Sequence, residues 1–149
     1  MSKEQLIKSR KRVKDFAEVY TPSWIVKDMI ALTDAHIPSR AILEPSCGNG
    51  AFLFEILSQK LERSRNVEDA WTSLRSLYGI DIQEDNVIEC RERLCSLFLS
   101  KYPNEDKSEI LETLTLNIVC GDFLTKRKYQ NGQPTCEIID FLDDEPRLL

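Results

Sequence analysis

The sequence of 149 residues is poor in several residue types on which common kinds of site depend. It has one histidine, His36, which argues against the Ser-His and Cys-His pairs of most nucleophilic enzymes. Its five cysteines form no CxxC motif, so we expect free thiols and no bound metal. No apolar run approaches the roughly 18 residues that span a bilayer, and the N-terminus has no apolar core. We therefore expect a cytoplasmic protein without a membrane partner.

Charge is distributed unevenly along a chain of otherwise ordinary composition. Hydrophobic residues make up 42% and charged residues 30%, which suits one globular domain with a core of its own. The net charge is −5, but residues 1–15 hold six basic and two acidic side chains, a local charge of +4 that leaves −9 for the rest. This basic arm either contacts phosphates or forms the solvated face of a helix. The acidic remainder argues against a free-standing DNA-binding domain.

Apolar residues alternate between helical and strand-like spacing along the chain. After a loosely helical segment at 1–19, Thr21 is placed to cap a helix in which Pro22 is the first residue, and that helix should end near Thr33. Further helices are expected at 50–63, 66–74 and 84–101, with Phe52 and Ile88 among their inward-facing residues. Strands are expected at 41–44, 77–82, 114–119 and 136–142, and a polar loop at 125–135.

Strands separated by helices at this spacing predict an α/β fold. Right-handed crossovers then give a parallel sheet with both faces covered, the front half of a doubly wound domain. We divide the chain into a basic helical N-terminal segment, 1–19, and one ligand-binding domain, 20–149. Ligands of such sheets bind at the carboxyl ends of the strands, so the residues that follow each predicted strand are the candidates for a site.

The stretch PSCGNG, residues 45–50, lies between the first strand and the helix that follows it. Glycine permits backbone conformations that a Cβ forbids and lets a ligand approach the main chain closely. The helix that opens here has unpaired N–H groups in its first turn, which favour negative charge. The loop therefore suits a nucleotide-like ligand, unless it is simply a structural turn. A dinucleotide fingerprint, GxGxxG, is disfavoured because Leu53 stands where the third glycine would pack.

Two acidic residues follow the next two strands. Asp81 ends the second strand, where a carboxylate can accept hydrogen bonds from ribose hydroxyls. Asp122 follows the third, where a carboxylate can accept from an adenine amino group and Phe123 can stack on the ring. Alone, each aspartate is more often a turn or cap residue. Together with the glycine turn, they mark three successive strand ends that could meet one adenosine-shaped ligand.

Four sequence elements resemble, in order, motifs of the S-adenosylmethionine-dependent DNA adenine N-6 methyltransferases of restriction–modification systems. Residues 20–22, YTP, resemble the tripeptide that opens the family. Residues 44–52, EPSCGNGAF, are similar to its (D/E)PxCGxGxF loop, and residues 121–124, GDFL, resemble its GDxL motif. Asp81 resembles its ribose-binding acid, with Ile82 beside the adenine. The resemblance covers roughly residues 16–124.

This resemblance implies a fold, a cofactor and a substrate. The fold would be the class I, Rossmann-like methyltransferase sheet, doubly wound and parallel, truncated here after about the fourth strand. The cofactor would be S-adenosylmethionine, and the substrate adenine in DNA. The cofactor-binding residues that the resemblance implies are Tyr20, Thr21, Pro22, Glu44, Pro45, Cys47, Gly48, Gly50, Phe52, Asp81, Ile82, Asp122 and Phe123.

The catalytic tetrapeptide of that family, (D/N/S)PP(Y/F), does not occur in the sequence, whose six prolines are never adjacent. In the family its polar side chain and a proline carbonyl accept the hydrogen bonds of the target amine, and its aromatic ring stacks on the flipped-out base. It is expected after the fourth strand, here 136–142, where the chain reads DDEPRLL. No residue is therefore assigned a catalytic role.

Three interpretations of the function remain open. In the first, the chain is the cofactor-binding part of a DNA adenine methyltransferase, active only with a partner chain that supplies the catalytic motif and the DNA recognition region. In the second, it is a non-catalytic remnant that binds the cofactor or a partner protein. In the third, it methylates RNA or a protein amide. A sheet that ends at its fourth strand exposes an edge, which predicts a completing partner or self-association.

Overall fold

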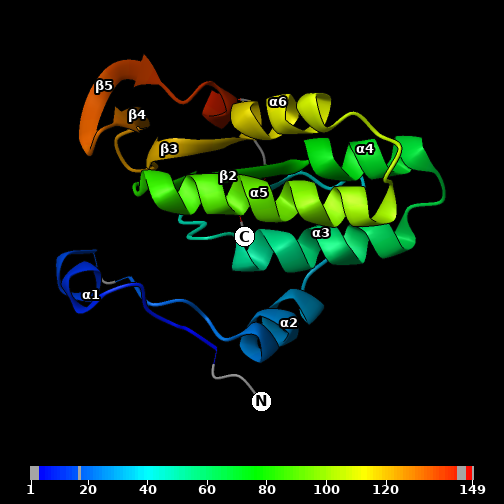
Figure 1. Cartoon of the computed structure of the whole chain (residues 1–149), viewed down its shortest axis with the longest axis horizontal. Coiled ribbons are helices and arrows are strands. Elements are labelled where there is room, and N and C mark those ends of the chain that lie inside the picture. The colour runs from blue at the N-terminus through cyan, green and yellow to red at the C-terminus, as the bar shows by residue number, and fades with distance from the viewer. Residues whose placement is uncertain (1–3, 17, 144–146, 149) are drawn as a thin grey trace.

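The computed structural model describes residues 4–16, 18–143 and 147–148, and these contain a six-stranded sheet with helices packed beside it (Figure 1). The strand order is β5-β4-β3-β2-β1-β6. Four strands are parallel: β1 (Ile42–Glu44), β2 (Leu77–Asp81), β3 (Ile118–Asp122) and β6 (Arg147–Leu148). The other two, β4 (Arg127–Gln130) and β5 (Gln133–Ile138), are antiparallel. The predicted mixed α/β, Rossmann-like class is confirmed.

The helices pack on one face of the sheet and form the main core. Their bounds are α2 (Ser23–Ala31), α3 (Ala51–Arg63), α4 (Val67–Arg75), α5 (Glu84–Lys101) and α6 (Lys107–Asn117). All five contribute buried residues to one apolar cluster, which also contains Ile42, Leu77 and Ile118 from the three central strands. α5 begins and ends at the predicted residues. Among the residues that the structure describes, no helix combines the length and apolarity that crossing a membrane requires.

The opposite face of the sheet carries a smaller apolar cluster. Side chains alternate along a strand, so Leu43, Ile80 and Val119 point to this face. They are covered by two residues that follow β5. Ile139 directly precedes the short 3-10 turn η1 (Asp140–Asp143), and Phe141 lies within it. The expectation that helices cover both faces is therefore wrong for the described residues, because a single 3-10 turn and its flanks occupy the second face.

The third strand was predicted at 114–119 and is present as β3, but its bounds were wrong, because α6 extends to Asn117 and β3 covers Ile118–Asp122. The helix has a strong cap. The side chain of Asp106 accepts hydrogen bonds from the backbone N–H groups of Ser108, at 2.7 Å, and Glu109, at 3.2 Å. Ile110 and Leu114, four residues apart, form its buried face.

The predicted polar loop at 125–135 and the predicted last strand at 136–142 are also wrong. β4 and β5 form an antiparallel hairpin, and its turn residues Asn131 and Gly132 have φ angles of 51° and 74°. An Asn-Gly pair with both φ angles positive is the usual signal for a tight hairpin. β5 ends at Ile138, and the chain then crosses the second face of the sheet.

The fourth parallel strand in chain order is β6 rather than residues 136–142. It pairs with β1 on the edge away from β2, with Ile42 opposite Arg147 and Leu43 opposite Leu148. After the β4–β5 hairpin at one edge of the sheet, the next strand in the described chain thus lies at the opposite edge. Among the described residues β6 is therefore the edge strand on this side of the sheet.

The start of α2 differs from the prediction. The helix begins at Ser23, and Pro22 rather than Thr21 is its N-cap residue. The carboxylate of Glu4 accepts hydrogen bonds from the backbone N–H of Ser23, at 3.1 and 3.2 Å. A negative charge stabilises a helix N-terminus, so the N-terminal segment supplies the cap that Thr21 does not.

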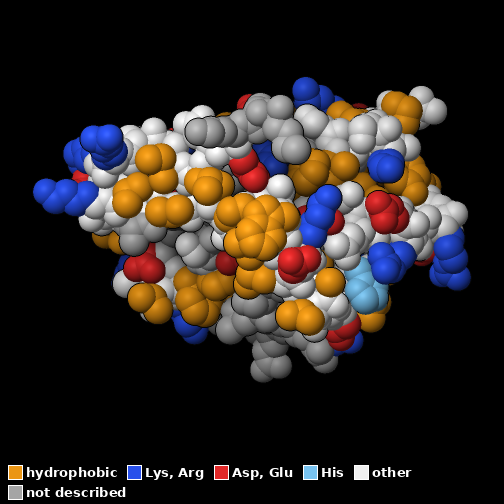
Figure 2. Space-filling view, turned by 90° about the horizontal axis from the view of Figure 1, so that it is seen from below, with side chains coloured by type: hydrophobic (Ala, Val, Ile, Leu, Met, Phe, Trp, Pro, Cys, Tyr) orange, Lys and Arg blue, Asp and Glu red, His pale blue; other side chains and the backbone are white. Residues whose placement is uncertain are grey.

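α2 buries a different face from the one that its apolar spacing indicates. Val26 and Ile30 are its buried residues, whereas the side chains of Trp24, Met29 and Leu32 are at least half exposed. Hydrophobic side chains accordingly gather on the side of the molecule that carries α1 and α2 (Figure 2).

Two predictions of inward-facing residues need correction, and one buried residue was not predicted. Ile88 is 48% exposed, and Phe52 is only partly buried. Lys60 on α3 is fully buried, and its Nζ donates to the carbonyl oxygens of Pro38 and Arg40 and to the hydroxyl of Ser76, at 3.1, 2.6 and 2.6 Å. These three acceptors satisfy the head group, while burial lowers its pKa to about 7.

At Gly50, the N-cap residue of α3, we expect a single added methyl group to have a large effect on stability. Its φ is +89°, and a Cβ there would lie 2.6 Å from Cys90 Sγ and 3.2 Å from the Cα of the same residue. Gly50→Ala should therefore lower the free energy of unfolding by about 3 kcal/mol through backbone strain and overlap with α5. At Gly132 φ is +74° but nothing lies within 4 Å, so Gly132→Ala should cost about 1 kcal/mol. Urea unfolding measures both, and equal losses would contradict close packing on α5.

Candidate functional site

A cleft of about 490 Å³ opens at the carboxyl ends of the three central strands. Four segments that are distant in the sequence line it. They are the chain before α2 (Phe16, Glu18, Val19, Tyr20, Thr21), the loop after β1 (Pro45, Ser46, Cys47, Gly48, Asn49, Ala51), the end of β2 (Asp81, Ile82, Gln83) and the end of β3 (Gly121, Asp122, Phe123, Leu124). The structure thus brings together the three strand ends and the YT dipeptide.

The glycine loop is folded onto the end of β2. The N–H of Cys47 donates to the carbonyl oxygen of Ile80 at 2.8 Å, and the N–H of Gly48 donates to Asp81 Oδ2 at 2.9 Å. Gly48 has a φ of +55°, and a Cβ at this position would lie 3.4 Å from the ring of Tyr20. The loop therefore has a left-handed residue at the point where the N-terminal segment approaches it.

Asp81 is a buried carboxylate, 9% exposed, that is already engaged by the protein. Besides the Gly48 N–H, it accepts hydrogen bonds at Oδ1 from the N–H of Gln83, at 2.8 Å, and from Asn86 Nδ2, at 3.2 Å. Burial raises the pKa of its carboxyl group, and these hydrogen bonds oppose the rise. An ionised carboxylate has about four acceptor positions, so one remains on Oδ2 for a ligand.

Asp122 serves as a turn residue, as the local interpretation predicts. Its Oδ1 accepts from the backbone N–H of Leu124 at 3.0 Å, and its Oδ2 accepts from the hydroxyl of Thr125 at 3.2 Å. The carboxylate still lines the cleft, beside the partly buried ring of Phe123. The turn therefore fixes the direction of Asp122 without using all of its acceptor positions.

Four residues that the resemblance implies do not line the cleft. Gly50 is buried against α5, Phe52 packs against the main core, and Pro22 is the N-cap residue of α2. Glu44 ends β1 and accepts from the N–H of Ser46 at 3.3 Å, and burial raises its pKa to about 7. The structure thus gives all four a local role in shaping the loop or its neighbours.

Sequence reasoning missed Glu18 and Asn49, which line the cleft. Glu18 stands two residues before Tyr20, and its Oε2 accepts from Arg12, at 2.6 Å, and from Asn86 Nδ2, at 2.8 Å. Asn49 Nδ2 donates to Glu89 Oε1 at 3.3 Å. The only signal for Asn49 was its position inside the glycine loop, and the only signal for Glu18 was its position next to the YTP element.

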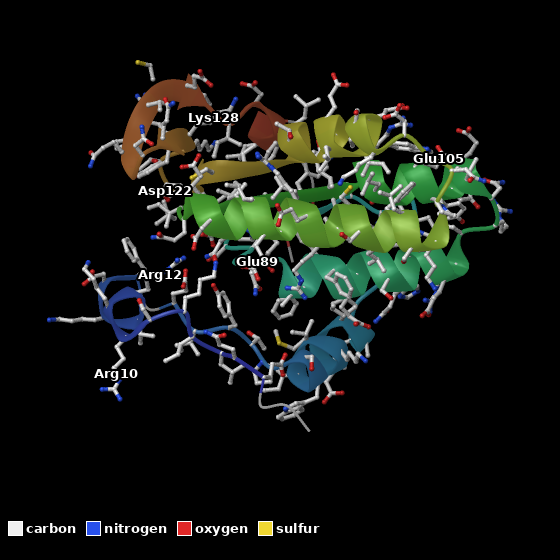
Figure 3. The ribbon with its side chains drawn as sticks, in the orientation of Figure 1. Arg10, Arg12, Glu89, Glu105, Asp122 and Lys128 are labelled. Atoms are coloured by element: carbon white, nitrogen blue, oxygen red, sulfur yellow. The ribbon has the colours of Figure 1, made fainter. Side chains whose placement is uncertain are left out.

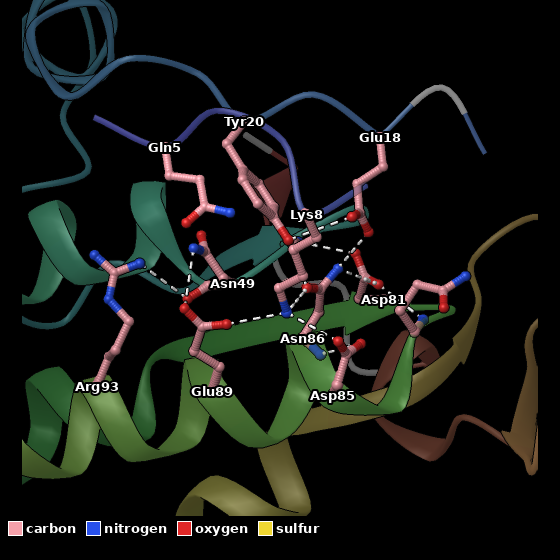
Figure 4. A network of polar contacts seen from close by, with 12 residues as sticks. Gln5, Lys8, Glu18, Tyr20, Asn49, Asp81, Asp85, Asn86, Glu89 and Arg93 are labelled. Atoms are coloured by element: carbon pink, nitrogen blue, oxygen red, sulfur yellow. Dashed lines mark hydrogen bonds and ion pairs between the residues drawn. The ribbon is translucent and has the colours of Figure 1, made fainter. Parts of the chain in front are cut away.

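The basic N-terminal segment is paired with acidic residues of α5. Lys8 Nζ lies 3.0 Å from both Asp85 Oδ2 and Glu89 Oε2, and Arg12 contacts Asp85 at 2.6 Å (Figures 3 and 4). Arg10, on the opposite side of α1 (Arg10–Phe16), points away from the protein (Figure 3). Part of the charge that was predicted to contact phosphates or solvent thus holds the segment on the domain.

These contacts shift two pKa values at the cleft wall. The hydrogen bond from Arg12 lowers the pKa of Asp85 to about 2. Burial, followed by the charge of Glu18, raises the pKa of Tyr20 to about 12, so its hydroxyl is protonated at neutral pH and donates to Asn86 Oδ1 at 2.8 Å. Among the described residues, no group of three or more His, Cys, Asp or Glu side chains is arranged to hold a metal ion.

The fold and the site together define a Rossmann-like α/β domain with a cleft at the carboxyl ends of its central parallel strands. Comparison with known families then identifies the group within that class. The family model for N-6 DNA methylases matches residues 4–115, most of the chain, and the protein belongs to this family. No curated protein sequence matches the chain.

Glu44 makes the stability of the site depend on pH. Between the ordinary pKa of 4.5 and the raised value of about 7, the folded state holds a proton that the unfolded state has released. The free energy of unfolding should therefore fall as the pH rises through this range, by about 3 kcal/mol in full. Glu44→Gln should remove the fall, and Glu62→Gln, exposed on α3, should keep it. The free energy of unfolding is measured by urea unfolding across this pH range. If it changed with pH in the same way in wild type and in Glu44→Gln, the assignment of the fall to Glu44 would be refuted.

Proposed function

We propose that this chain is the S-adenosylmethionine-binding part of a DNA adenine N-6 methyltransferase of restriction–modification type. One observation carries the proposal: the YT dipeptide, the glycine loop and two strand-end aspartates line a single cleft. Membership of the N-6 DNA methylase family supports it, because that family generally depends on S-adenosylmethionine. The DNA substrate follows from the same family and from the YTP element.

The residues present fit such a cofactor. The volume of about 490 Å³ lies within the range of roughly 300–1,000 Å³ that small-molecule sites have. Asp81 retains an acceptor position for a ribose hydroxyl, and Asp122 retains positions for an adenine amino group. Ile82 and Phe123 offer apolar surface to a flat ring beside these acids. The glycine loop and Tyr20 would face the methionine part.

The cofactor, when bound, supplies an electrophilic methyl group. In this proposal the residues of the chain bind and orient it, and none of the described residues performs the transfer itself. The tetrapeptide that would engage the target amine follows the fourth parallel strand in the family. That strand is β6, so its place lies beyond Leu148 and not after residue 142. We propose that the tetrapeptide and the DNA recognition region are supplied from outside the described residues, and that a completing strand would pair along β6.

Cofactor binding gives the first test. Titration calorimetry with S-adenosylmethionine should detect one site per chain. Asp81→Ala should weaken binding by about 1–3 kcal/mol, because a buried acceptor to the ligand is lost. Asp28→Ala, on the exposed side of α2, is the matched control and should leave the affinity unchanged. Folded wild-type protein that releases no heat would refute the proposed ligand, and an Asp81→Ala variant with wild-type affinity would remove Asp81 from the site.

Methyl transfer gives the second test and separates the interpretations. Radiolabelled S-adenosylmethionine is incubated with unmethylated DNA and the chain, alone and with the product of the adjacent reading frame. Label in DNA only when both are present supports the split enzyme. Cofactor binding without label under either condition favours the non-catalytic remnant. Label in RNA or protein instead of DNA would overturn the assigned substrate.

A further inference from the structure

Asn86 connects two walls of the cleft without lining it. It lies in the first turn of α5, and its side chain is fully buried. Three of its four side-chain partners, Glu18, Tyr20 and Asp81, line the cleft, and they come from the N-terminal segment and from the end of β2. No other residue in Figure 4 contacts both of these walls through one side chain.

The amide of Asn86 uses its full hydrogen-bonding capacity. Its Oδ1 accepts from Lys8 Nζ at 2.7 Å and from the hydroxyl of Tyr20 at 2.8 Å. Its Nδ2 donates to Glu18 Oε2 at 2.8 Å and to Asp81 Oδ1 at 3.2 Å. An ammonium can only donate and ionised carboxylates can only accept, so the partners determine the orientation of the amide. Taken together, the four partners require an acceptor and a donor in one side chain, which an amide supplies and neither an ionised carboxylate nor an apolar group does.

One wall of the cleft is formed by the chain before α2, residues 16 and 18–21, and is called the N-terminal wall here. It depends on such polar contacts. α1 has no buried residues, so apolar packing of that helix does not hold the segment in place. Polar contacts with the domain run from Lys8 and Arg12 to acidic residues of α5, from Glu18 and Tyr20 to Asn86, and from Glu4 to the start of α2. Loss of the amide would leave the carboxylates of Glu18 and Asp81 without a shared donor.

We propose that Asn86 is a positioning residue for the ligand site: it holds the N-terminal wall, through Glu18 and Tyr20, in register with Asp81, so that docking of the wall and ligand binding are coupled. The identity of the ligand as S-adenosylmethionine rests on the proposed function. The coupling itself rests on the hydrogen bonds of Asn86 and can be tested without a ligand.

Replacing Asn86 with aspartate should make the coupling depend on pH. The charged groups that face it are Lys8 and Glu18 from the N-terminal segment, Asp81 from β2 and Asp85 from its own helix, with Tyr20 as a neutral hydroxyl. Ionised, the new side chain cannot donate and repels Glu18 and Asp81. Protonated, it can donate to one of them again. The variant should therefore recover as the pH falls, and the carboxylates around it should place that recovery above the usual range of an aspartate.

Asn86→Asp is compared with wild type by calorimetry with S-adenosylmethionine from pH 5 to pH 8. At pH 8 the affinity should be lower by about 10-fold or more, the scale of losing one hydrogen bond to a charged group. At pH 5 it should approach the wild-type value measured at the same pH. Asn66→Asp is the matched control, because the Asn66 side chain only accepts, from the N–H of Asp69 at 2.9 Å, and an aspartate can replace it. This control should follow wild type throughout.

Hydrogen exchange provides a measurement that needs no ligand. The backbone N–H of Tyr20 donates to the carbonyl oxygen of Leu6 at 2.7 Å within the docked segment. In Asn86→Asp at pH 8, amides of residues 4–21 should exchange faster than in wild type, while those of β2 and β3 stay protected. At pH 5 the difference should shrink.

Each outcome decides a separate question. Wild-type affinity and wild-type exchange in Asn86→Asp at pH 8 would overturn the coupling. So would a loss that is equal at pH 5 and pH 8, because a general packing defect does not reverse on protonation. If wild type itself does not bind S-adenosylmethionine, the proposed function fails, and hydrogen exchange alone still decides whether Asn86 holds the wall.

Discussion

The hydrogen bond from the Gly48 N–H to the carboxylate of Asp81 is the interaction on which the site depends. It joins the loop after β1 to the end of β2, two strand ends that lie side by side only because the sheet is parallel. Gly48 can make it because its φ of +55° turns the backbone toward β2. The same carboxylate contacts Asn86 and thereby the N-terminal segment. One buried acid therefore organises loop, strand and wall, and cannot be assigned to ligand binding alone.

The central part of the fold could be predicted from the sequence because its signals are local and agree with one another. The apolar residues of 84–101 recur at one helical period, the first turn is acidic and the segment contains no glycine or proline, and α5 has these bounds. The strands at 42–44 and 77–81 are short, apolar and flanked by turns. At 114–119 the signals conflict: Leu114 and Leu116 suit a strand as well as a helix. The Asp106 cap three residues before Glu109 resolves the conflict, because it starts a helix that extends to Asn117.

The candidate site was predictable where a residue follows a strand, since topology alone brings such residues to one edge. This reasoning located Asp81, Asp122 and the glycine loop. It could not find Glu18, or the role of Asn86, because both depend on how the N-terminal segment lies across α5. It also could not separate Gly48, which faces Tyr20 in the cleft, from Gly50, which is buried against Cys90. The two glycines of this motif are therefore required for different physical reasons, and only the packing around each of them shows which reason applies.

The β4–β5 hairpin makes the two sides of the sheet unequal. Its outer strand carries Pro134, which has no N–H to offer to a neighbour, and its side chains are mostly exposed. On the other side β6 runs parallel to β1 and has only two residues in the described part of the chain. The two edges of the described sheet thus differ in kind: one is an antiparallel strand that contains a proline, and the other is a short parallel strand.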